Sequence, residues 1–246
     1  MSSFHLFGPT HAAALAGLTL VIYALVRTGR TLTGTALRRF ERVLASLVLA
    51  LWLTYVAWDS LNGAFDVATS LPLQLCDFVA LVAGAAFMSR NRVLQALAYF
   101  WGLALSTQAL ITPDVAGSVT SLSFAAFWLY HAFVVGAGVY VVAVHGFRPN
   151  LKDLLTSQAL GMLWVLGVFT LDVRTGWNYG YLGRSTPSIP SLIDHLGPWP
   201  GRVVIMVALG LVAMTLLWLP WLVIGHGPHA HSDGDTRRQR KTADDA

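Results

Sequence analysis

The chain has 246 residues, of which 55% are hydrophobic and 11% are charged, and its mean hydropathy is +0.61. Soluble globular proteins carry about 25% charged residues. The 16 basic and 12 acidic residues are therefore too few to cover a water-facing surface, and we expect lipid to surround most of the chain. This composition excludes a soluble enzyme and a nucleic-acid-binding domain, and it makes membrane lipids the expected partners.

Seven apolar stretches approach the roughly 20 residues that a helix needs to cross about 30 Å of hydrocarbon. We predict an all-α bundle of seven transmembrane helices that forms one domain over residues 1–225. The polar tail at 226–246 has no apolar periodicity and is predicted to be disordered. The predicted spans are 11–27, 43–58, 71–88, 93–111, 122–144, 154–173 and 202–225.

The basic residues predict how the bundle is oriented. Thirteen of them lie in the first, third and fifth connections and in the tail, whereas three lie in the remaining connections. By the positive-inside rule, the N-terminus is then outside and the C-terminus is in the cytoplasm. No basic residue precedes Arg27, so the N-terminus lacks the positive region of a cleaved signal peptide. We expect a multi-pass protein of the cell membrane.

Polar side chains are concentrated toward the predicted outer face. An unpaired carboxylate or imidazole in hydrocarbon costs several kcal/mol, so a polar residue in a span needs a partner or a function. The inner half has almost no polar residue expected to be buried beyond Gln95, and we therefore expect the functional site near the outer face. The polar residues of that face include His5, His11, Asp59, Asp66, Gln74, Cys76, Asp77, Gln108, Asp114, His131, Asp172, Asn178 and Asp194.

Cys76 and His131 are the main catalytic candidates. At a rise of 1.5 Å per residue, Cys76 lies roughly 7 Å and His131 roughly 13 Å below the outer boundary. On neighbouring helices a thiol and an imidazole at these depths would make a nucleophile and its base. A third polar group would orient the imidazole, with Asp77, Asp114 and Asp59 as alternatives.

The same two residues also have plainer interpretations. A lone cysteine in a membrane helix is often a small apolar filler, and His131 alternatively serves as an interhelical hydrogen-bond donor or a proton relay. The single cysteine excludes an internal disulfide and any Cys-x-x-Cys motif. No HExxH-type spacing or other ligand cluster occurs in the spans, so we expect no metal and no cofactor.

The outer loop at 174–201 has two interpretations. Pro198 and Pro200 restrict the backbone on either side of Trp199, where the last span begins. The loop is either a lid over an outer cavity or an anchor at the membrane interface. Asn178 and Tyr179 in this loop, together with Gln74, are candidate donors to an oxyanion.

Several segments together resemble the YwaF-like bacterial integral membrane proteins, from Phe4 to about Leu222. The segments that carry this resemblance are FHLFGPTH at 4–11, LPLQLCD at 71–77, ALITPD at 109–114, FWLYH at 127–131, NY at 178–179 and GPWP at 197–200. A eukaryotic relative of that family is a multi-pass, cysteine-dependent acyltransferase of ether phospholipids. The resemblance matches its cysteine to Cys76 and its histidine to His131.

These observations lead to one hypothesis and one alternative. In the hypothesis, Cys76 attacks a lipid acyl ester from a cavity open to the outer face and His131 acts as the base, so that acyl groups are transferred or hydrolysed. Alternatively, the protein is a transporter or a binding protein whose outer cavity holds a small molecule or lipid unchanged. The one-sided distribution of polar residues favours a single site over alternating access.

Overall fold

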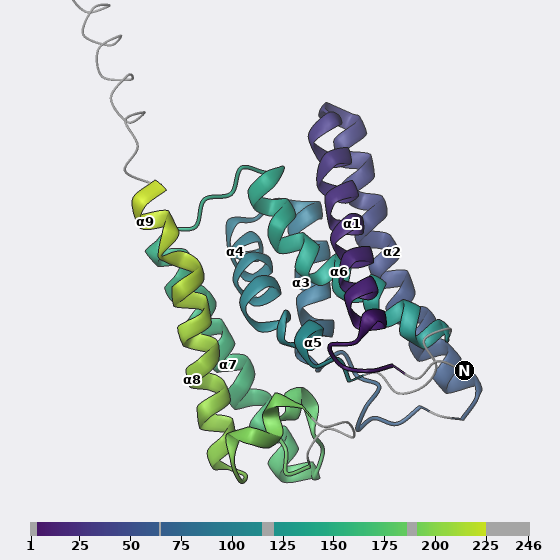
Figure 1. Cartoon of the computed structure of the whole chain (residues 1–246), viewed down its shortest axis with the longest axis vertical. Helices are drawn as coiled ribbons and strands as arrows, with labels where there is room; N and C mark the ends of the chain where they lie inside the picture. The colour runs from purple at the N-terminus through teal and green to yellow at the C-terminus, as the bar shows by residue number, and fades with distance from the viewer. Residues whose placement is uncertain (1–3, 64, 115–120, 186–190, 225–246) are drawn as a thin grey trace, which may run out of the picture.

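The computed structural model describes residues 4–63, 65–114, 121–185 and 191–224. The side chains of residues 55, 58, 59, 122 and 123 are also outside the description. The tail predicted to be disordered, at 226–246, lies outside the described residues. Within the described ranges all regular elements are helices, which confirms the all-α prediction (Figure 1).

Seven helical segments correspond to the seven predicted spans. One of them, from Arg92 to Ile111, consists of α4, the π-helix η1 and α5. The elements in chain order are α1 (Pro9–Thr31), α2 (Gly34–Leu61), α3 (Leu75–Ser89), α4 (Arg92–Phe100), η1 (Trp101–Leu105), α5 (Gln108–Ile111), α6 (Leu122–Ala143), α7 (Leu151–Thr175), the 3₁₀-helices η2 (Tyr179–Tyr181) and η3 (Leu192–Leu196), α8 (Gly201–Trp218) and α9 (Pro220–Ile224).

Among the described residues, 5 helices are long and apolar enough to cross a membrane. α3 is apolar but has only 15 residues, and α2 is outside this set although it has 28 residues. The five segments are Pro9–Thr31, Arg92–Ile111, Phe124–Ala143, Leu151–Thr175 and Gly201–Val223.

The starts of α2 and α3 differ most from those predicted. α2 begins at Gly34 rather than at residue 43, because a helix continues through its charged first turns, where hydropathy no longer detects it. α3 begins at Leu75 rather than at residue 71, since Pro72 lies in the approach and Gln74 has an extended backbone. As a result, Cys76 is in the first turn of its helix and not one turn inside it.

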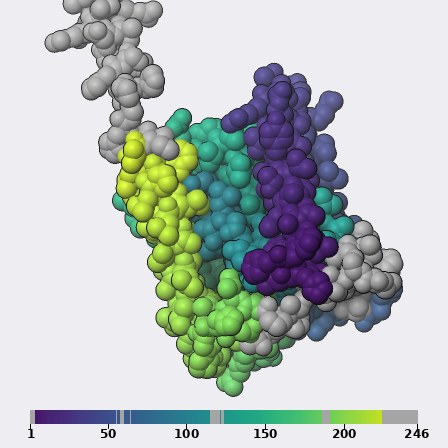
Figure 2. Space-filling model, in the orientation of Figure 1, coloured from purple at the N-terminus to yellow at the C-terminus, as the bar shows by residue number. Residues whose placement is uncertain are grey.

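The helices form three groups across the bundle, which Figure 1 shows. α3, α4 and α6 lie in the centre, with α1 and α2 on one side and α7 and α8 on the other. η1 and α6 approach so closely that a Cβ on Gly102 would lie 2.8 Å from the carbonyl oxygen of Val134. In the space-filling view the surface is hollowed between α8 and the central helices (Figure 2).

The bundle has two ends that differ in their connections. We call the first the Cys76 end; the described residues at 62–74, 112–114 and 176–200 lie there. The opposite end, which we call the Glu41 end, carries the shorter connections at 32–33, 90–91 and 144–150.

A buried charge cluster lies at the Glu41 end. Glu41 is fully buried, and its two carboxylate oxygens accept hydrogen bonds of 2.7 and 2.9 Å from Arg90. His145 Nε2 is 2.8 Å and the Tyr140 hydroxyl is 3.4 Å from the same carboxylate. The prediction that this half of the molecule buries almost no polar residue beyond Gln95 is therefore wrong. Hydropathy places Glu41 in a connection, whereas it lies on α2, which begins at Gly34 and brings its side chain into the bundle.

The cluster joins α2, the α3–α4 turn and the end of α6. Burial lowers the pKa of His145, so the neutral ring donates its Nε2–H to Glu41. Nearby, Arg92 at the start of α4 pairs with Asp153 at the start of α7 through contacts of 2.9 and 2.6 Å. These ion pairs tie the helices together at one end of the bundle.

Glu41→Gln is expected to destabilise the protein by about 3–5 kcal/mol, because it removes one partner of a buried ion pair and leaves Arg90 unpaired. Arg39→Gln is a suitable control, since Arg39 is exposed on the same helix, and its expected effect is within about 0.5 kcal/mol. Unfolding in detergent would measure both. Equal stability of the two variants would contradict the role assigned to Glu41.

Single-cysteine labelling would test the predicted orientation, which places the Cys76 end outside. In a Cys76→Ala background, Thr69→Cys and Arg148→Cys each place one thiol at an exposed position, at opposite ends of the bundle. A membrane-impermeant maleimide should label only Thr69→Cys in intact cells, and both variants after permeabilisation. Labelling of Arg148→Cys alone in intact cells would show that the orientation is opposite to the predicted one.

Candidate active site

The first turn of α3 forms the centre of the candidate site. Its N-cap, Gln74, makes no side-chain capping hydrogen bond, and the first helical bond runs from the amide of Phe78 to the carbonyl oxygen of Gln74 at 3.0 Å. Within the described residues, the amides of Leu75, Cys76 and Asp77 thus have no hydrogen-bond acceptor. Such a helix N-terminus carries partial positive charge and stabilises an anion placed beside it.

The Cys76 thiol lies beside a buried hydroxyl from another helix. Cys76 is partly buried, and its side chain contacts Ser106. Ser106 follows η1, where its amide bonds the carbonyl oxygen of Trp101 five residues earlier at 2.9 Å. The Ser106 Oγ is buried and makes no hydrogen bond of ordinary geometry with the described residues. π-Helical turns are frequent at functional sites, and this one directs a hydroxyl toward the thiol.

Tyr130 links the first turn of α3 to α6. Its hydroxyl lies 2.9 Å from Asp77 Oδ1 and 3.3 Å from the carbonyl oxygen of Cys76. The Tyr130 ring also meets the ring of His131, with centroids 5.8 Å apart. Tyr130 therefore contacts both Cys76 and His131.

His131 is buried, and one of its ring nitrogens makes a hydrogen bond to the backbone. Nδ1 lies 2.9 Å from the carbonyl oxygen of Phe127, and the two rings pack with centroids 4.1 Å apart. A carbonyl only accepts, so Nδ1 carries the hydrogen, and Nε2 of the neutral ring holds a free lone pair. Nε2 makes no hydrogen bond with another described residue. This is the tautomer that a general base requires.

The helices that carry Cys76 and His131 pack against each other. No direct hydrogen bond joins the two side chains within the described part of the chain, and Tyr130 contacts both residues. In ligand-free structures catalytic hydrogen bonds are often long and shorten only when substrate binds.

The three carboxylates considered as partners of the imidazole have different surroundings. Asp77 pairs with Tyr130, and Asp114 accepts a hydrogen bond of 2.9 Å from the Tyr181 hydroxyl. Asp59 lies on α2, and its side chain is outside the described residues. The group that holds His131 Nδ1 is the Phe127 carbonyl, a local partner four residues earlier on the same helix.

Tyr179 makes hydrogen bonds to the segment that precedes α3. Its fully buried side chain donates to the carbonyl oxygen of Val67 at 2.5 Å and accepts from the amide of Leu71 at 3.1 Å. Burial raises the pKa of Tyr179, which keeps the phenol protonated as this donor. Since its one hydrogen is used, Tyr179 positions the loop rather than donating to an oxyanion. Gln74 Oε1 accepts from the amide of Gly180 at 2.8 Å and joins the same two segments.

The remaining loop candidates, Asn178 and Trp199, are packed against their surroundings. Trp199 Nε1 donates to the carbonyl oxygen of Leu182 at 3.0 Å. Its ring packs with Phe169 at a centroid distance of 6.1 Å, and the Arg184 guanidinium lies 4.7 Å from it. Asn178 Oδ1 is buried without a hydrogen-bond partner in the described residues. These contacts hold the Trp199 ring against α7 and its own loop.

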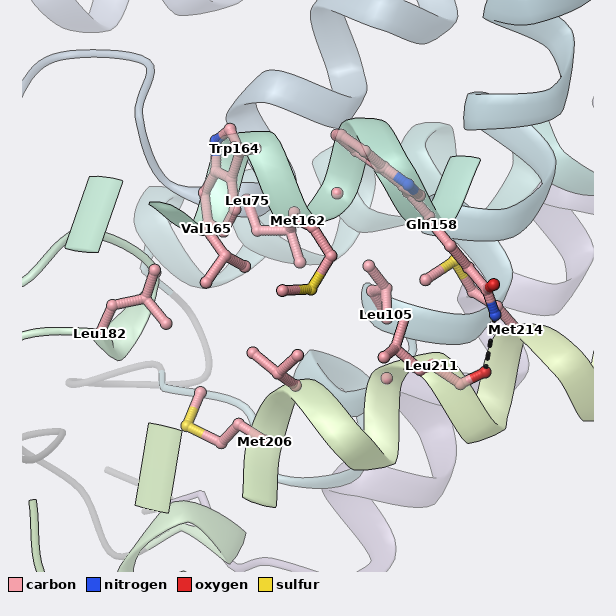
Figure 3. A pocket seen from close by; sticks show the side chains of 15 residues that line it. Leu75, Leu105, Gln158, Met162, Trp164, Val165, Leu182, Met206, Leu211 and Met214 are labelled. Carbon is pink, nitrogen blue, oxygen red and sulfur yellow. Dashed lines mark hydrogen bonds between the residues drawn. The ribbon is translucent and has the colours of Figure 1, made fainter. Parts of the chain in front are cut away.

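An apolar cavity of about 110 Å³ adjoins the first turn of α3. It lies between α7, α8 and η1, and Figure 3 shows side chains from these helices directed into it. Leu75 and Leu105 line it, and they directly precede Cys76 and Ser106 in the sequence. The cavity therefore adjoins the turn that carries the candidate nucleophile, and its lining is mostly apolar.

Ser106 and Tyr130 were missed by the sequence analysis. A polar run from Ser106 to Gln108 interrupts the apolar span and marks the break after η1. Tyr130 directly precedes His131, but only the rotation of α6 shows that its hydroxyl faces Asp77. Sequence alone therefore offers a signal for Ser106 and none for the Tyr130 contact.

The chain was also compared with known proteins. Residues 6–218 match the model of the TMEM164 family. No curated protein and no solved structure gives a match. The match confirms a multi-pass integral membrane protein but does not confirm the YwaF-like name.

Tyr130→Phe is expected to destabilise the protein by about 1–3 kcal/mol, because the Asp77 carboxyl group then lacks its buried hydrogen-bond donor. Tyr23→Phe is the matched control, since Tyr23 is 65% exposed on α1. Thermal unfolding in the same detergent would compare the two variants. An unchanged melting temperature for Tyr130→Phe would rule out the proposed link between α3 and α6.

Proposed function

Because the chain belongs to the TMEM164 family of multi-pass membrane proteins, we propose that it transfers or hydrolyses the acyl groups of membrane lipids. Cys76 is the nucleophile and His131 is the base. The observation that carries the proposal is the position of Cys76 in the first turn of α3, where three backbone amides have no acceptor among the described residues.

The first half of the reaction forms a thioester. His131 Nε2 accepts the thiol proton as the Cys76 sulfur attacks the ester carbonyl carbon, and a tetrahedral oxyanion results. The carbon–oxygen bond to the alcohol then breaks, and the proton on His131 passes to the leaving alkoxide. The products of this half are acyl-Cys76 and a lysolipid with a free hydroxyl group.

The second half of the reaction regenerates the thiol. A water molecule or the hydroxyl of a second lipid attacks the thioester carbonyl, and His131 accepts its proton. The sulfur leaves and recovers that proton. Water as the acceptor gives a free fatty acid, whereas a lipid hydroxyl gives a new ester, and the same two residues serve both outcomes.

The amides at the start of α3 supply the electrostatic stabilisation that this reaction needs. Removal of one hydrogen-bond donor to a developing oxyanion costs about 2.7–4 kcal/mol in a well-studied serine protease. The amides of Leu75, Cys76 and Asp77 are held in place by the helix itself, and the Asp77–Tyr130 contact fixes that helix against α6. The Ser106 hydroxyl beside the thiol is a further donor.

The location of the site fits a lipid substrate. Cys76 is in the first turn of α3, where the helix meets the loops of one end of the bundle, and the preceding residue, Leu75, lines an apolar cavity. A membrane lipid is divided in the same way, because its ester group lies near the membrane boundary and its acyl chain lies in the hydrocarbon. In the proposed orientation the substrate comes from the outer leaflet of the cell membrane.

Cys76→Ala in proteoliposomes is expected to abolish the release of lysolipid, and His131→Gln to slow it by about 10²–10⁴-fold, as expected for loss of a general base. His195→Gln, an exposed histidine in the loop between α7 and α8, is the control and should behave as wild type. Mass spectrometry of the lipids would measure the rates. Equal lipid profiles for wild type and Cys76→Ala would favour a binding or transport protein instead.

A further inference from the structure

We propose that the cavity between α7 and α8 is the acyl-chain pocket of the Cys76 site, and that Gln158 sets the longest chain it accepts. This inference rests on the proposed function. It assigns a specificity-determining residue to a helix that the reaction itself does not use.

One end of the cavity lies beside the first turn of α3. Leu75 and Leu105 line this end, and each directly precedes a residue of the site, Cys76 and Ser106 respectively. Gly180 and Leu182 of the α7–α8 loop also line the cavity. In the proposal, an acyl group bound to the Cys76 sulfur has its carbonyl at the α3 amides, and its chain passes Leu75 into the apolar space.

The cavity extends from this end along α7 and α8. Met206 and Met214 both line it on α8, and eight residues at 1.5 Å each separate them by about 12 Å along the helix axis. Figure 3 shows Met162 and Met206 directed toward the space from opposite helices. Unbranched methionine side chains adapt their shape to an irregular ligand, which suits a flexible chain.

Two glycines keep the cavity open. Gly161 lies on its α7 wall, where an added Cβ would be 3.6 Å from the Trp101 ring, an ordinary contact. Gly210 lies on the α8 wall, where an added Cβ would be 3.0 Å from Leu105 Cδ2. Larger side chains at either position would occupy the space assigned to the acyl chain.

A polar pair lies at the far end of an otherwise apolar lining. Gln158 Nε2 donates to Thr215 Oγ1 at 3.2 Å and lies 3.3 Å from the carbonyl oxygen of Leu211. These bonds hold the amide between α7 and α8. The dashed line in Figure 3 marks the bond to Leu211. A chain that extended past this amide would have to break hydrogen bonds in an apolar setting, which is unfavourable. The amide therefore ends the pocket.

Photo-crosslinking tests occupancy without requiring turnover. The probe is phosphatidylcholine with a diazirine on its acyl chain, in nanodiscs that contain wild type or Cys76→Ala protein. Labelling is expected on the cavity residues of α8, from Met206 to Met214, in both proteins. Gly161→Val should reduce this labelling at least fivefold, whereas Gly167→Val should not, because Gly167 on the same helix faces open space.

Chain-length preference tests the role of Gln158. With phosphatidylcholines of graded acyl length, Gln158→Ala should raise the rate for the longest chains at least fivefold relative to the shortest. Gly161→Val should shift the preference toward short chains, and Gly167→Val should leave it as in wild type. An unchanged preference in Gln158→Ala, measured on protein that unfolds as wild type does, would overturn the role of that residue.

The outcomes separate the two proposals. Labelling of the cavity in Cys76→Ala, together with no turnover by wild type, would support the pocket and refute the reaction. Equal labelling of α8 in wild type, Gly161→Val and Gly167→Val would overturn the pocket, even if wild type turns over lipid.

Discussion

The helix α3 is too short to cross a bilayer, and the rest of the site depends on this constraint. Its 15 residues extend about 22 Å at 1.5 Å per residue, against about 30 Å of hydrocarbon. The amides of its first turn have no hydrogen-bond acceptor among the described residues. Such amides stabilise negative charge that develops nearby. In the proposed reaction this charge develops on the thiol of the first turn and on the carbonyl oxygen of the lipid ester. The Cys76 end is organised around this turn, with Tyr179 and Gln74 holding its approach.

The position of α3 against α6 is fixed at both ends. At the Cys76 end, Tyr130 of α6 contacts Asp77 and the Cys76 carbonyl. At the Glu41 end, Glu41 joins Arg90, which follows α3, to His145, which follows α6. Two polar clusters at opposite ends thus keep the helices that carry Cys76 and His131 in register. The buried charges at the Glu41 end act on the site through this packing and make no contact with the thiol among the described residues.

The sequence predicted the number and type of helices because hydropathy reports which stretches lipid can surround. It did not predict the start of α2 or α3, since a helix extends through charged residues and an apolar run includes non-helical ones. Glu41 appeared to belong to a connection, and its partners, Arg90 and His145, are 49 and 104 residues away. The candidates Cys76 and His131 followed from depth and residue type. Tyr130 and Ser106 depend on the rotation of α6 and on the π-helical turn of η1, and neither rotation nor turn type can be read from apolar periodicity.

The central claim is that an acyl group resides on Cys76 during the reaction. The most direct measurement is the intact mass of the purified protein, quenched in acid after brief mixing with a phospholipid of one defined acyl chain. The account predicts a mass increase equal to that acyl group, located on the peptide that contains Cys76 and removed by neutral hydroxylamine. Lipid turnover without this adduct, or an adduct on another residue, would contradict it.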